Sequence, residues 1–310
     1  MQTRRQVLEH ALSLAGVACI PGARAATTDD TASETVSLAK LGGKPDDSKF
    51  DNTPALNAAL ARQIPSLYVP RGSWYFLTKP NPITYPMEIV GGSLSTASLI
   101  RRYKPGSDLD GLLTVHSHGC RLSRLSVMAG GSTAGGAGVA LIGDTKTDPD
   151  YSVLEDLYVS HEPGTTATWS NAIILDGSAR TGEPSGARDI NIRNCHLFSS
   201  TSAACVIRNG VNTSIRDGGM FPAGGTTGRL QITGKGPIGT QTVNVDISYL
   251  GGLSLDNCQW VTVRAAVITG EVTNAQSARD VIVSARCLAA VQSFWTRGRV
   301  IDPADLAPRT

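Results

Sequence analysis

Short stretches in which apolar and polar residues alternate recur along most of the chain from about residue 110 onward. The clearest one, residues 190–197, reads apolar, polar, apolar, polar, Asn, Cys, polar, apolar. Alternation with a period of two gives a β-strand one inward apolar face. Asn tolerates the left-handed backbone of a tight turn, so we predict such turns at Asn194 and Asn257. Three further stretches fit this frame, two of them with Arg124 or Asp156 in the Asn position: residues 122–127, 154–159 and 253–260.

A second repeated unit lies between these stretches, and each copy is an apolar run that ends at a glycine. The copies occupy residues 141–143, 174–177, 206–210, 232–234 and 267–270. The two units alternate, with about 25 to 36 residues between unit ends, which is typical of solenoid repeats. The pattern predicts an all-β solenoid of roughly seven to ten coils. One outward column of side chains is expected at the strand ends: His116, Gly143, Asp176, Arg208, Thr233 and Thr269.

A different pattern precedes the repeats and predicts one short helix between a turn and a strand. Thr53 suits the N-cap and Pro54 suits the first helical position, where its missing N–H is not needed. Leu56 and Leu60 follow four residues apart and share one face. The apolar run at residues 64–69 then predicts a strand, which Pro70 and Gly72 end.

Residues 41–75 as a set resemble the opening of the pectate-lyase-like superfamily. The residues that carry the resemblance are Leu41-Gly42-Gly43 with Pro45-Asp46-Asp47, then Asp51-Asn52-Thr53, then Val69-Pro70-Arg71-Gly72-Ser73-Trp74. The resemblance implies a single-stranded right-handed parallel β-helix with a short N-terminal capping helix. It also implies that this segment covers one end of the solenoid and carries no chemistry.

The N-terminus is typical of an export signal. Arg4 and Arg5 precede an apolar stretch from Ala11 to Ile20, and small residues around Arg24 suit cleavage before Ala26. The paired arginines resemble a twin-arginine signal, although the general secretory route remains an alternative. We therefore predict a signal at residues 1–25, a linker at 26–40 and a β-helix domain at 41–310. The mature protein is expected to be periplasmic or secreted.

Composition narrows the choice of partners. The net charge is +2, and removal of the signal leaves basic and acidic residues in equal number, so we expect no nucleic-acid partner. No apolar run after the signal is long enough to span a bilayer. The five cysteines that follow the signal show no metal-binding spacing and are expected as small buried residues of the coil stack. The sequence does not decide the oligomeric state, and a trimer is among the states that it allows.

Candidate chemistry collects around one strand end of the predicted solenoid. Asp176 and Arg208 are expected to lie on adjacent coils, beside Asp189, and we predict these three as catalytic. Trp169, Arg180 and Glu162, from neighbouring loops, are predicted to bind substrate. An aromatic face suits a sugar ring, and the charged groups suit hydroxyl and carboxylate groups. Trp260, by contrast, occupies an inward position of its frame and is expected in the core.

These residues favour an enzyme that acts on an acidic, uronate-containing polysaccharide. A lyase needs a base together with an Arg or Ca²⁺ that neutralises the developing enolate, whereas a hydrolase needs two carboxylates. No compact motif selects between them, no metal ligands are identified, and Ca²⁺ stays open as a cofactor. The alternative is a non-catalytic β-helix that binds glycans or serves as a structural spike or surface module.

Overall fold

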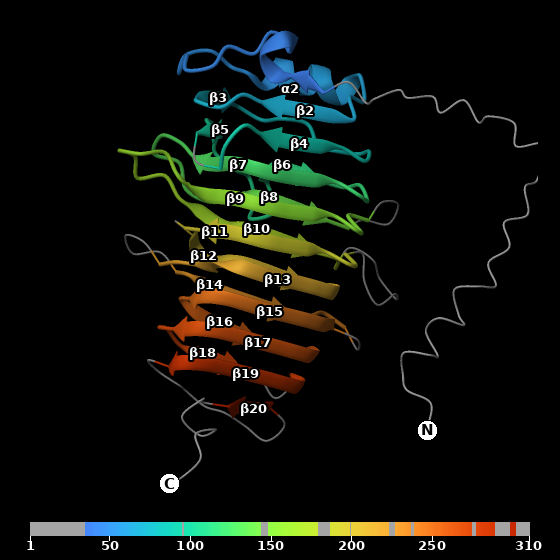
Figure 1. The fold of residues 1–310 in the computed structure, drawn as a ribbon, viewed down its shortest axis with the longest axis vertical. Coiled ribbons are helices and arrows are strands. Elements are labelled where there is room, and N and C mark those ends of the chain that lie inside the picture. The colour runs from blue at the N-terminus through green and yellow to red at the C-terminus, as the bar shows by residue number, and fades with distance from the viewer. Residues whose placement is uncertain are drawn as a thin grey trace, which may run out of the picture. The chain divides into compact units, whose positions relative to one another are not determined.

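A computed structural model describes residues 35–301 except 95, 144–147, 179–186, 199, 223–226, 237–238, 275–276 and 289–297. In this part of the chain, parallel strands stack coil upon coil along one axis (Figure 1). They form two sheets, and from β6 to β19 the chain alternates between the two sheets strand by strand. Three predicted features lie outside the described residues. They are the signal, Arg180, and the part of the C-terminal tail that follows residue 301.

The larger sheet has 13 strands, and all of its pairs are parallel. Its main path runs β1-β2-β4-β7-β9-β11-β13-β15-β17-β19-β20, with β3 and β5 beside it. The strands are β1 (Val36–Ser37), β2 (Ser66–Val69), β3 (Ser73–Leu77), β4 (Glu88–Gly91), β5 (Ala97–Arg101), β7 (Arg121–Ala129), β9 (Val153–His161), β11 (Asn191–Leu197), β13 (Val211–Met220), β15 (Thr240–Leu250), β17 (Cys258–Ile268), β19 (Arg279–Leu288) and β20 (Gly298–Ile301).

The smaller sheet has seven strands in the order β18-β16-β14-β12-β10-β8-β6. The strands are β6 (Gly111–Val115), β8 (Ala137–Ile142), β10 (Trp169–Asp176), β12 (Ser200–Arg208), β14 (Arg229–Thr233), β16 (Gly252–Leu255) and β18 (Val272–Asn274). Seven successive strands in one sheet agree with the predicted number of coils.

The two repeated units correspond to the two sheets, with two exceptions. Residues 253–255 form part of β16 in the smaller sheet, and Cys258 opens β17 in the larger one. Asn257 therefore lies at a corner between sheets, whereas Asn194 lies inside β11. Residues 267–270 also depart from the prediction, because they end β17 rather than a strand of the smaller sheet. Strands of the two sheets have similar spacing of apolar residues, so the sequence alone assigned residues 253–255 and 267–270 to the wrong repeated unit.

The predicted left-handed conformation is present at Asn194 and Asn257, and at Asn194 it recurs on neighbouring coils. Asn194 has φ 48° and Asn257 has φ 41°. Arg124 and Asp156, in the Asn position of neighbouring strands, both have φ 53°. The Asn194 Nδ2 atom donates a hydrogen bond of 2.7 Å to Oδ1 of Asp156. The left-handed residues Arg124, Asp156 and Asn194 thus occupy equivalent positions on β7, β9 and β11.

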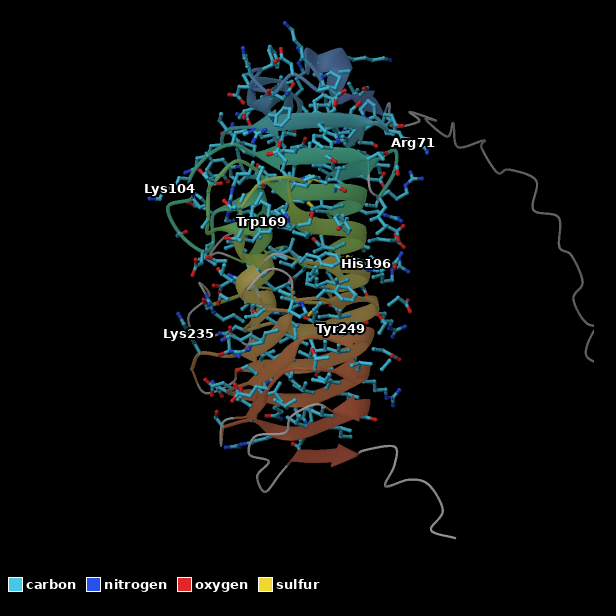
Figure 2. The ribbon with its side chains drawn as sticks, turned by 90° about the vertical axis from the view of Figure 1, so that its left-hand side faces the viewer. Arg71, Lys104, Trp169, His196, Lys235 and Tyr249 are labelled. Carbon is cyan, nitrogen blue, oxygen red and sulfur yellow. The ribbon has the colours of Figure 1, made fainter. Side chains whose placement is uncertain are left out.

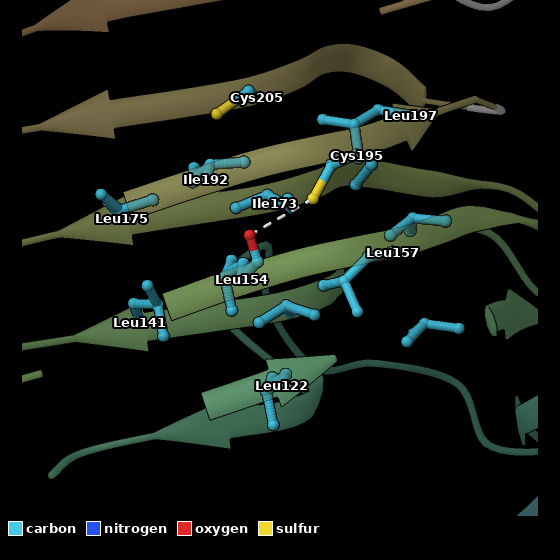
Figure 3. Close-up of a cluster of buried hydrophobic side chains, with 14 of the residues drawn as sticks. Leu122, Leu141, Leu154, Leu157, Ile173, Leu175, Ile192, Cys195, Leu197 and Cys205 are labelled. Carbon is cyan, nitrogen blue, oxygen red and sulfur yellow. Dashed lines mark hydrogen bonds between the residues drawn. The ribbon is translucent and has the colours of Figure 1, made fainter. Parts of the chain in front are cut away.

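The inner faces of the coils form a continuous apolar core (Figure 3). Leu122, Leu154 and Ile192 occupy the same position on successive coils and are at most 1% exposed. Cys120, Cys195, Cys205 and Cys258 are free and buried, as expected from the sequence. Cys195 Sγ donates to the Leu154 carbonyl at 3.6 Å. Burial raises the pKa of the Cys195 and Cys258 thiols to about 12.

Helix α2 (Thr53–Ala61) covers the N-terminal end of the stack (Figure 1). Leu56 and Leu60 are buried, as predicted, but the N-cap is Asn52 rather than Thr53. Asp51 takes over the capping bond, because its Oδ1 atom accepts a hydrogen bond of 2.9 Å from the Thr53 backbone N–H. Pro54 still lies in the first turn of the helix, where its missing N–H is not needed.

The folded part begins before the predicted boundary at residue 41. Strand β1 pairs with β2, and the 3-10 helix η1 (Leu38–Leu41) follows it directly. Leu38 is fully buried in the core. The last residues of the predicted linker are therefore part of the first coil. No helix among the described residues is long and apolar enough to cross a membrane.

Candidate functional site

Asp176 and Arg208 are neighbours on adjacent coils, as the sequence predicts. They are paired in the register of β10 and β12, and Arg208 Nη1 lies 2.5 Å from Asp176 Oδ2. The other carboxylate oxygen, Oδ1, accepts a bond of 2.9 Å from the Ser178 backbone N–H. Asp176 is only 3% exposed. Both oxygens are thus engaged within the protein, which is the arrangement of a structural ion pair.

The outward column that contains this pair differs in part from the predicted one. Ile142, Asp176, Arg208 and Thr233 are paired in register across β8, β10, β12 and β14. Gly143 lies one residue beyond this column, and Thr269 follows β17 in the other sheet. An error of one residue moves a side chain to the opposite face of a strand, so a column cannot be fixed from spacing alone.

Trp169 is buried and does not form the exposed sugar platform that we predicted. It opens β10, it is fully buried, and its Nε1 atom donates to the Ser160 carbonyl at 2.7 Å. The guanidinium of Arg101 lies over its ring, 4.3 Å from the centroid. Figure 2 marks the position of Trp169 on the coil stack. The sequence placed it in a loop because the apolar run of β10 begins three residues later, at Ala172.

Arg101 is a fully buried cation held by carbonyl groups. It donates to the carbonyls of Gly135, Thr133 and Thr168, the last at 3.0 Å. Burial lowers its pKa to about 10, so it remains charged at neutral pH. Arg101 therefore ties together the loops that follow β7 and β9.

Glu162 takes part in the same loop structure rather than lying open to substrate. Its carboxylate forms two parallel bonds with Arg102, of 2.7 and 2.8 Å, and accepts the Gly131 backbone N–H at 3.2 Å. Its exposed fraction is 9%. The predicted substrate-binding role loses its basis here, because this carboxylate is already satisfied.

Asp189 belongs to a different surface from Asp176. It precedes β11 of the larger sheet, has a left-handed φ of 55°, and accepts a hydrogen bond from the Asn212 side chain. Asp176 ends β10 of the smaller sheet and bonds to Arg208. The structure thus shows each carboxylate with its own partner and does not join them in one constellation.

Trp260, which was expected in the core, is the exposed tryptophan of the described chain. It is 51% exposed and has a left-handed φ of 57°. The left-handed backbone interrupts the alternation of β17, so the residue turns outward while Val261 and Val263 remain buried. Trp260, Thr262 and Arg264 then follow at alternate positions along this strand.

A polar hollow that was not predicted from the sequence lies on the outer face of the larger sheet. It has a volume of about 400 Å³ and is lined by Arg216, Asn244, Asp246, Thr262 and Arg264, together with Val245. Asp246 is paired in register with Arg216 on β13 and with Arg264 on β17. A charged residue two places after a small polar one occurs on all three strands, which is the signal that could have located the hollow.

The charged groups of this hollow are open. Arg216, Asp246 and Arg264 are exposed, and none of them forms an ion pair with another described residue. Among the described residues, Arg216 bonds only through its Nε atom, which donates to Ser214 Oγ at 3.1 Å. Two guanidinium groups and one carboxylate therefore remain available to a ligand.

A second hollow, of about 280 Å³, lies beside the smaller sheet. Its lining includes Lys79, Tyr103, Asp110 and Ile142. Asp110 accepts the backbone N–H groups of Gly106 and Ser107, and Tyr103 donates to the Gly111 carbonyl at 3.0 Å. These polar groups hold the local loop, which leaves few of them for a ligand.

Aromatic rings form a stack on the outer face of the larger sheet. Phe221 lies between Phe198 and Tyr249, with centroid distances of 4.8 and 5.0 Å, and Tyr158 packs on Phe198 at 5.2 Å. Figure 2 marks His196 and Tyr249, which lie in this part of the coil stack. The ring faces cover one another, so this stack supports the coils and offers mainly ring edges to a sugar.

Within the described ranges, no three His, Cys, Asp or Glu side chains come together as a metal site. No family model and no curated protein matches the chain. Solved structures do match. The enzymatically active domain of tailspike protein 2 from bacteriophage CBA120 has a TM-score of 0.51 at 10% identity, over 87% of this chain and 43% of that one.

Two further solved structures are more distant. A protein of Geobacillus virus E2 has a TM-score of 0.44 at 10% identity, over 83% of this chain and 58% of its own. The catalytic unit of an α-1,3-glucanase from Streptomyces thermodiastaticus has a TM-score of 0.39 at 11% identity, over 81% of this chain and 58% of its own. The chain thus spans about two-fifths to three-fifths of these structures. The tailspike likeness agrees with the fold that the sequence predicts, and the chain is a single-stranded right-handed parallel β-helix.

Proposed function

We propose that the protein is exported and binds an acidic, uronate-containing polysaccharide on the outer face of its larger sheet. The observation that carries the proposal is the open hollow in which Arg216 and Arg264 lie on either side of Asp246. Asn244 and Thr262 add neutral hydrogen-bonding groups. Trp260 lies near the start of β17, before Thr262 and Arg264, on the same face.

The chemistry of these groups suits a charged sugar. A guanidinium binds a carboxylate through two parallel hydrogen bonds, and such charge-assisted bonds are stronger than neutral ones. The amide, hydroxyl and carboxylate oxygens suit sugar hydroxyl groups. The exposed ring of Trp260 can cover the apolar face of a neighbouring sugar. A neutral polysaccharide would leave both arginines without a partner.

A binding measurement tests this proposal. The mature protein, beginning at residue 26, is titrated calorimetrically with polygalacturonate, alginate and neutral dextran. The acidic polymers should bind and dextran should not. Arg216→Gln with Arg264→Gln should weaken binding at least about tenfold, because each charge-assisted bond contributes roughly 1.5–3 kcal/mol.

The matched control is Arg62→Gln with Arg71→Gln. It removes the same charge from exposed positions near the N-terminal end, where Figure 2 marks Arg71. This control should stay within about twofold of the unmodified protein. Unchanged binding in the Arg216 and Arg264 double variant would refute the proposed site.

Cleavage of the bound polysaccharide, by a lyase or hydrolase reaction, is the second candidate. Asp246 favours the lyase reaction, because an exposed carboxylate between two arginines can act as the base that removes the proton beside a uronate carboxylate, while the arginines neutralise the enolate that develops. The fold is compatible with catalysis, since a tailspike enzymatically active domain shares it. Catalysis by Asp176, Arg208 and Asp189 stays a prediction from the sequence.

Product analysis separates binding from cleavage. Unsaturated-product absorbance indicates a lyase, and new reducing ends without that absorbance indicate a hydrolase. Asp246→Asn should abolish either product if Asp246 acts, whereas Asp176→Ala with Arg208→Ala should do so if the sequence-based site acts. A parallel assay with EDTA tests Ca²⁺. Binding without product from any polymer would leave the non-catalytic role.

Export is tested separately. Arg4→Lys with Arg5→Lys should prevent the appearance of mature protein in the periplasm or medium if the twin-arginine route is used. The mature N-terminus, read by sequencing, should lie near Ala26. Export that persists in the double variant would favour the general secretory route.

A further inference from the structure

The open hollow is part of a longer outward column that has one residue on each strand of the larger sheet from β7 to β19. Pairing in register places these residues side by side: Ser123, Glu155, Arg193, Arg216, Asp246, Arg264 and Ser284. The charges along the column therefore follow a fixed order.

Part of this column is neutralised within the protein. Glu155 lies 3.0 Å from Arg193 and 2.5 Å from Arg121, so these three charges are engaged with one another. Arg216, Asp246 and Arg264 form no ion pair within the described part of the chain. The portion of the column open to a ligand thus has the order positive, negative, positive.

The spacing of this order suits a polymer that lies across the strands. Neighbouring strands are about 4.8 Å apart, so the two arginines are separated by roughly 10 Å with Asp246 midway between them. One sugar unit of an extended glycan advances by about the distance between two neighbouring strands. A chain running along the solenoid axis would then place successive sugars opposite Arg216, Asp246 and Arg264.

The middle position discriminates between polymers. In a homopolymer of uronates, a carboxylate would face Asp246, and like charges at close range repel each other. In a polymer whose acidic sugars alternate with uncharged ones, carboxylates face both arginines. The uncharged sugar then presents hydroxyl groups that donate to the Asp246 carboxylate.

We infer that the preferred ligand is a polysaccharide in which acidic and uncharged sugars alternate, bound across the strands of the larger sheet. This inference rests on the proposed function and narrows its substrate class. Asp246 acts as the specificity-determining residue, because it opposes a third consecutive carboxylate. Trp260 lies four residues before Arg264 on β17, roughly 13 Å away along the strand, so it would contact a side branch and not the main chain.

The experiment compares polymers of matched length with the mature protein. Hyaluronan and unsulfated chondroitin, which alternate a uronate with an N-acetylhexosamine, are the alternating probes, and polygalacturonate is the homopolymer. The alternating probes should bind about tenfold more tightly per uronate. Asp246→Asn should strengthen homopolymer binding about tenfold and weaken binding of the alternating probes about two- to fivefold.

The opposite signs of these two changes distinguish specificity from a general effect of charge. Asp108→Asn, at an exposed carboxylate elsewhere, should change neither affinity by more than about twofold. Equal or tighter binding of polygalacturonate by the unmodified protein would overturn this inference while leaving the proposed function in place. So would an Asp246→Asn effect of the same sign on both polymers. Binding of no acidic polymer would overturn both.

Discussion

Trp169 and Trp260 show that the local surroundings decide whether a tryptophan is buried or exposed. Trp169 is fully buried beneath Arg101, whereas Trp260 is 51% exposed on a left-handed backbone. A bulky residue rarely adopts positive φ, because its Cβ atom crowds the following carbonyl group. Strain of this kind is often found at functional sites. Trp260 is therefore better explained by a surface role than by packing.

Substitution of Trp260 should separate stability from binding. Trp260→Asn is expected to raise the free energy of unfolding by about 0.5–1 kcal/mol, because Asn tolerates the left-handed conformation. Trp260→Ala should give no such gain. Urea unfolding measures the difference, and an Asn variant that is less stable than the Ala variant would argue against strain at this position. Both variants should bind acidic polysaccharide more weakly.

Arg101 should matter far more to stability than its lack of a carboxylate partner suggests. Arg101→Met would leave the carbonyls of Thr133, Gly135 and Thr168 without this donor. We expect a loss of about 3–5 kcal/mol in the free energy of unfolding. Arg62→Met, at an exposed position, should change it by less than about 0.5 kcal/mol. A loss under 1 kcal/mol for Arg101→Met would show that water replaces the guanidinium.

At the scale of elements, side chains of like kind form columns because each strand repeats the position of its neighbour. The stacked rings from Tyr158 to Tyr249 form one such column. Gly219 leaves room for it, since a Cβ atom there would lie 2.5 Å from the Phe221 ring. The stack thus joins four coils on their solvent side, where the apolar core gives no support.

Removal of the middle ring should break this connection. Phe221→Leu is expected to lower the free energy of unfolding by about 1–3 kcal/mol, since aromatic pairs contribute roughly 0.5–1.5 kcal/mol each beyond burial. Tyr249→Phe is the matched control, because it keeps the ring and should cost less than about 0.5 kcal/mol. Chemical denaturation checks both. An equal cost for the two variants would mean that the Tyr249 hydroxyl, 2.8 Å from Thr269, matters as much as stacking.

For the whole molecule, the sequence predicts the architecture much better than the site. Apolar alternation, the left-handed turns at Asn194 and Asn257, and the capping helix all follow from local rules that act over a few residues. The hollow depends on register across three strands, and no single segment contains it. Trp260 was misplaced because one left-handed residue reverses the alternation. Arg180 lies outside the described residues, so its predicted role is untested.

The buried thiols give the molecule a defined response to alkaline pH. Burial raises the pKa of Cys195 and Cys258 to about 12, whereas an unfolded thiol ionises near 9. The unfolded state therefore loses protons first, and stability should fall between about pH 9 and pH 12. At pH 10 each thiol should contribute a loss of about 1 kcal/mol relative to pH 8.

Urea unfolding of reduced protein at pH 8 and pH 10 measures this loss. Cys195→Ala should be less stable at both values, because it leaves a cavity, but its loss on going to pH 10 should be smaller by about 1 kcal/mol. An unchanged difference between the two pH values would show that this thiol is not protected from ionisation.

The column of one outward residue per coil also bears on how such a protein can change over generations. A single codon substitution at Arg216, Asp246 or Arg264 alters one step of the charge order while the inward residues of that coil stay as they are. Duplication or loss of a whole coil by recombination would lengthen or shorten the order without exposing the core. New ligand preferences could then arise by rearranging coils, with no new fold required.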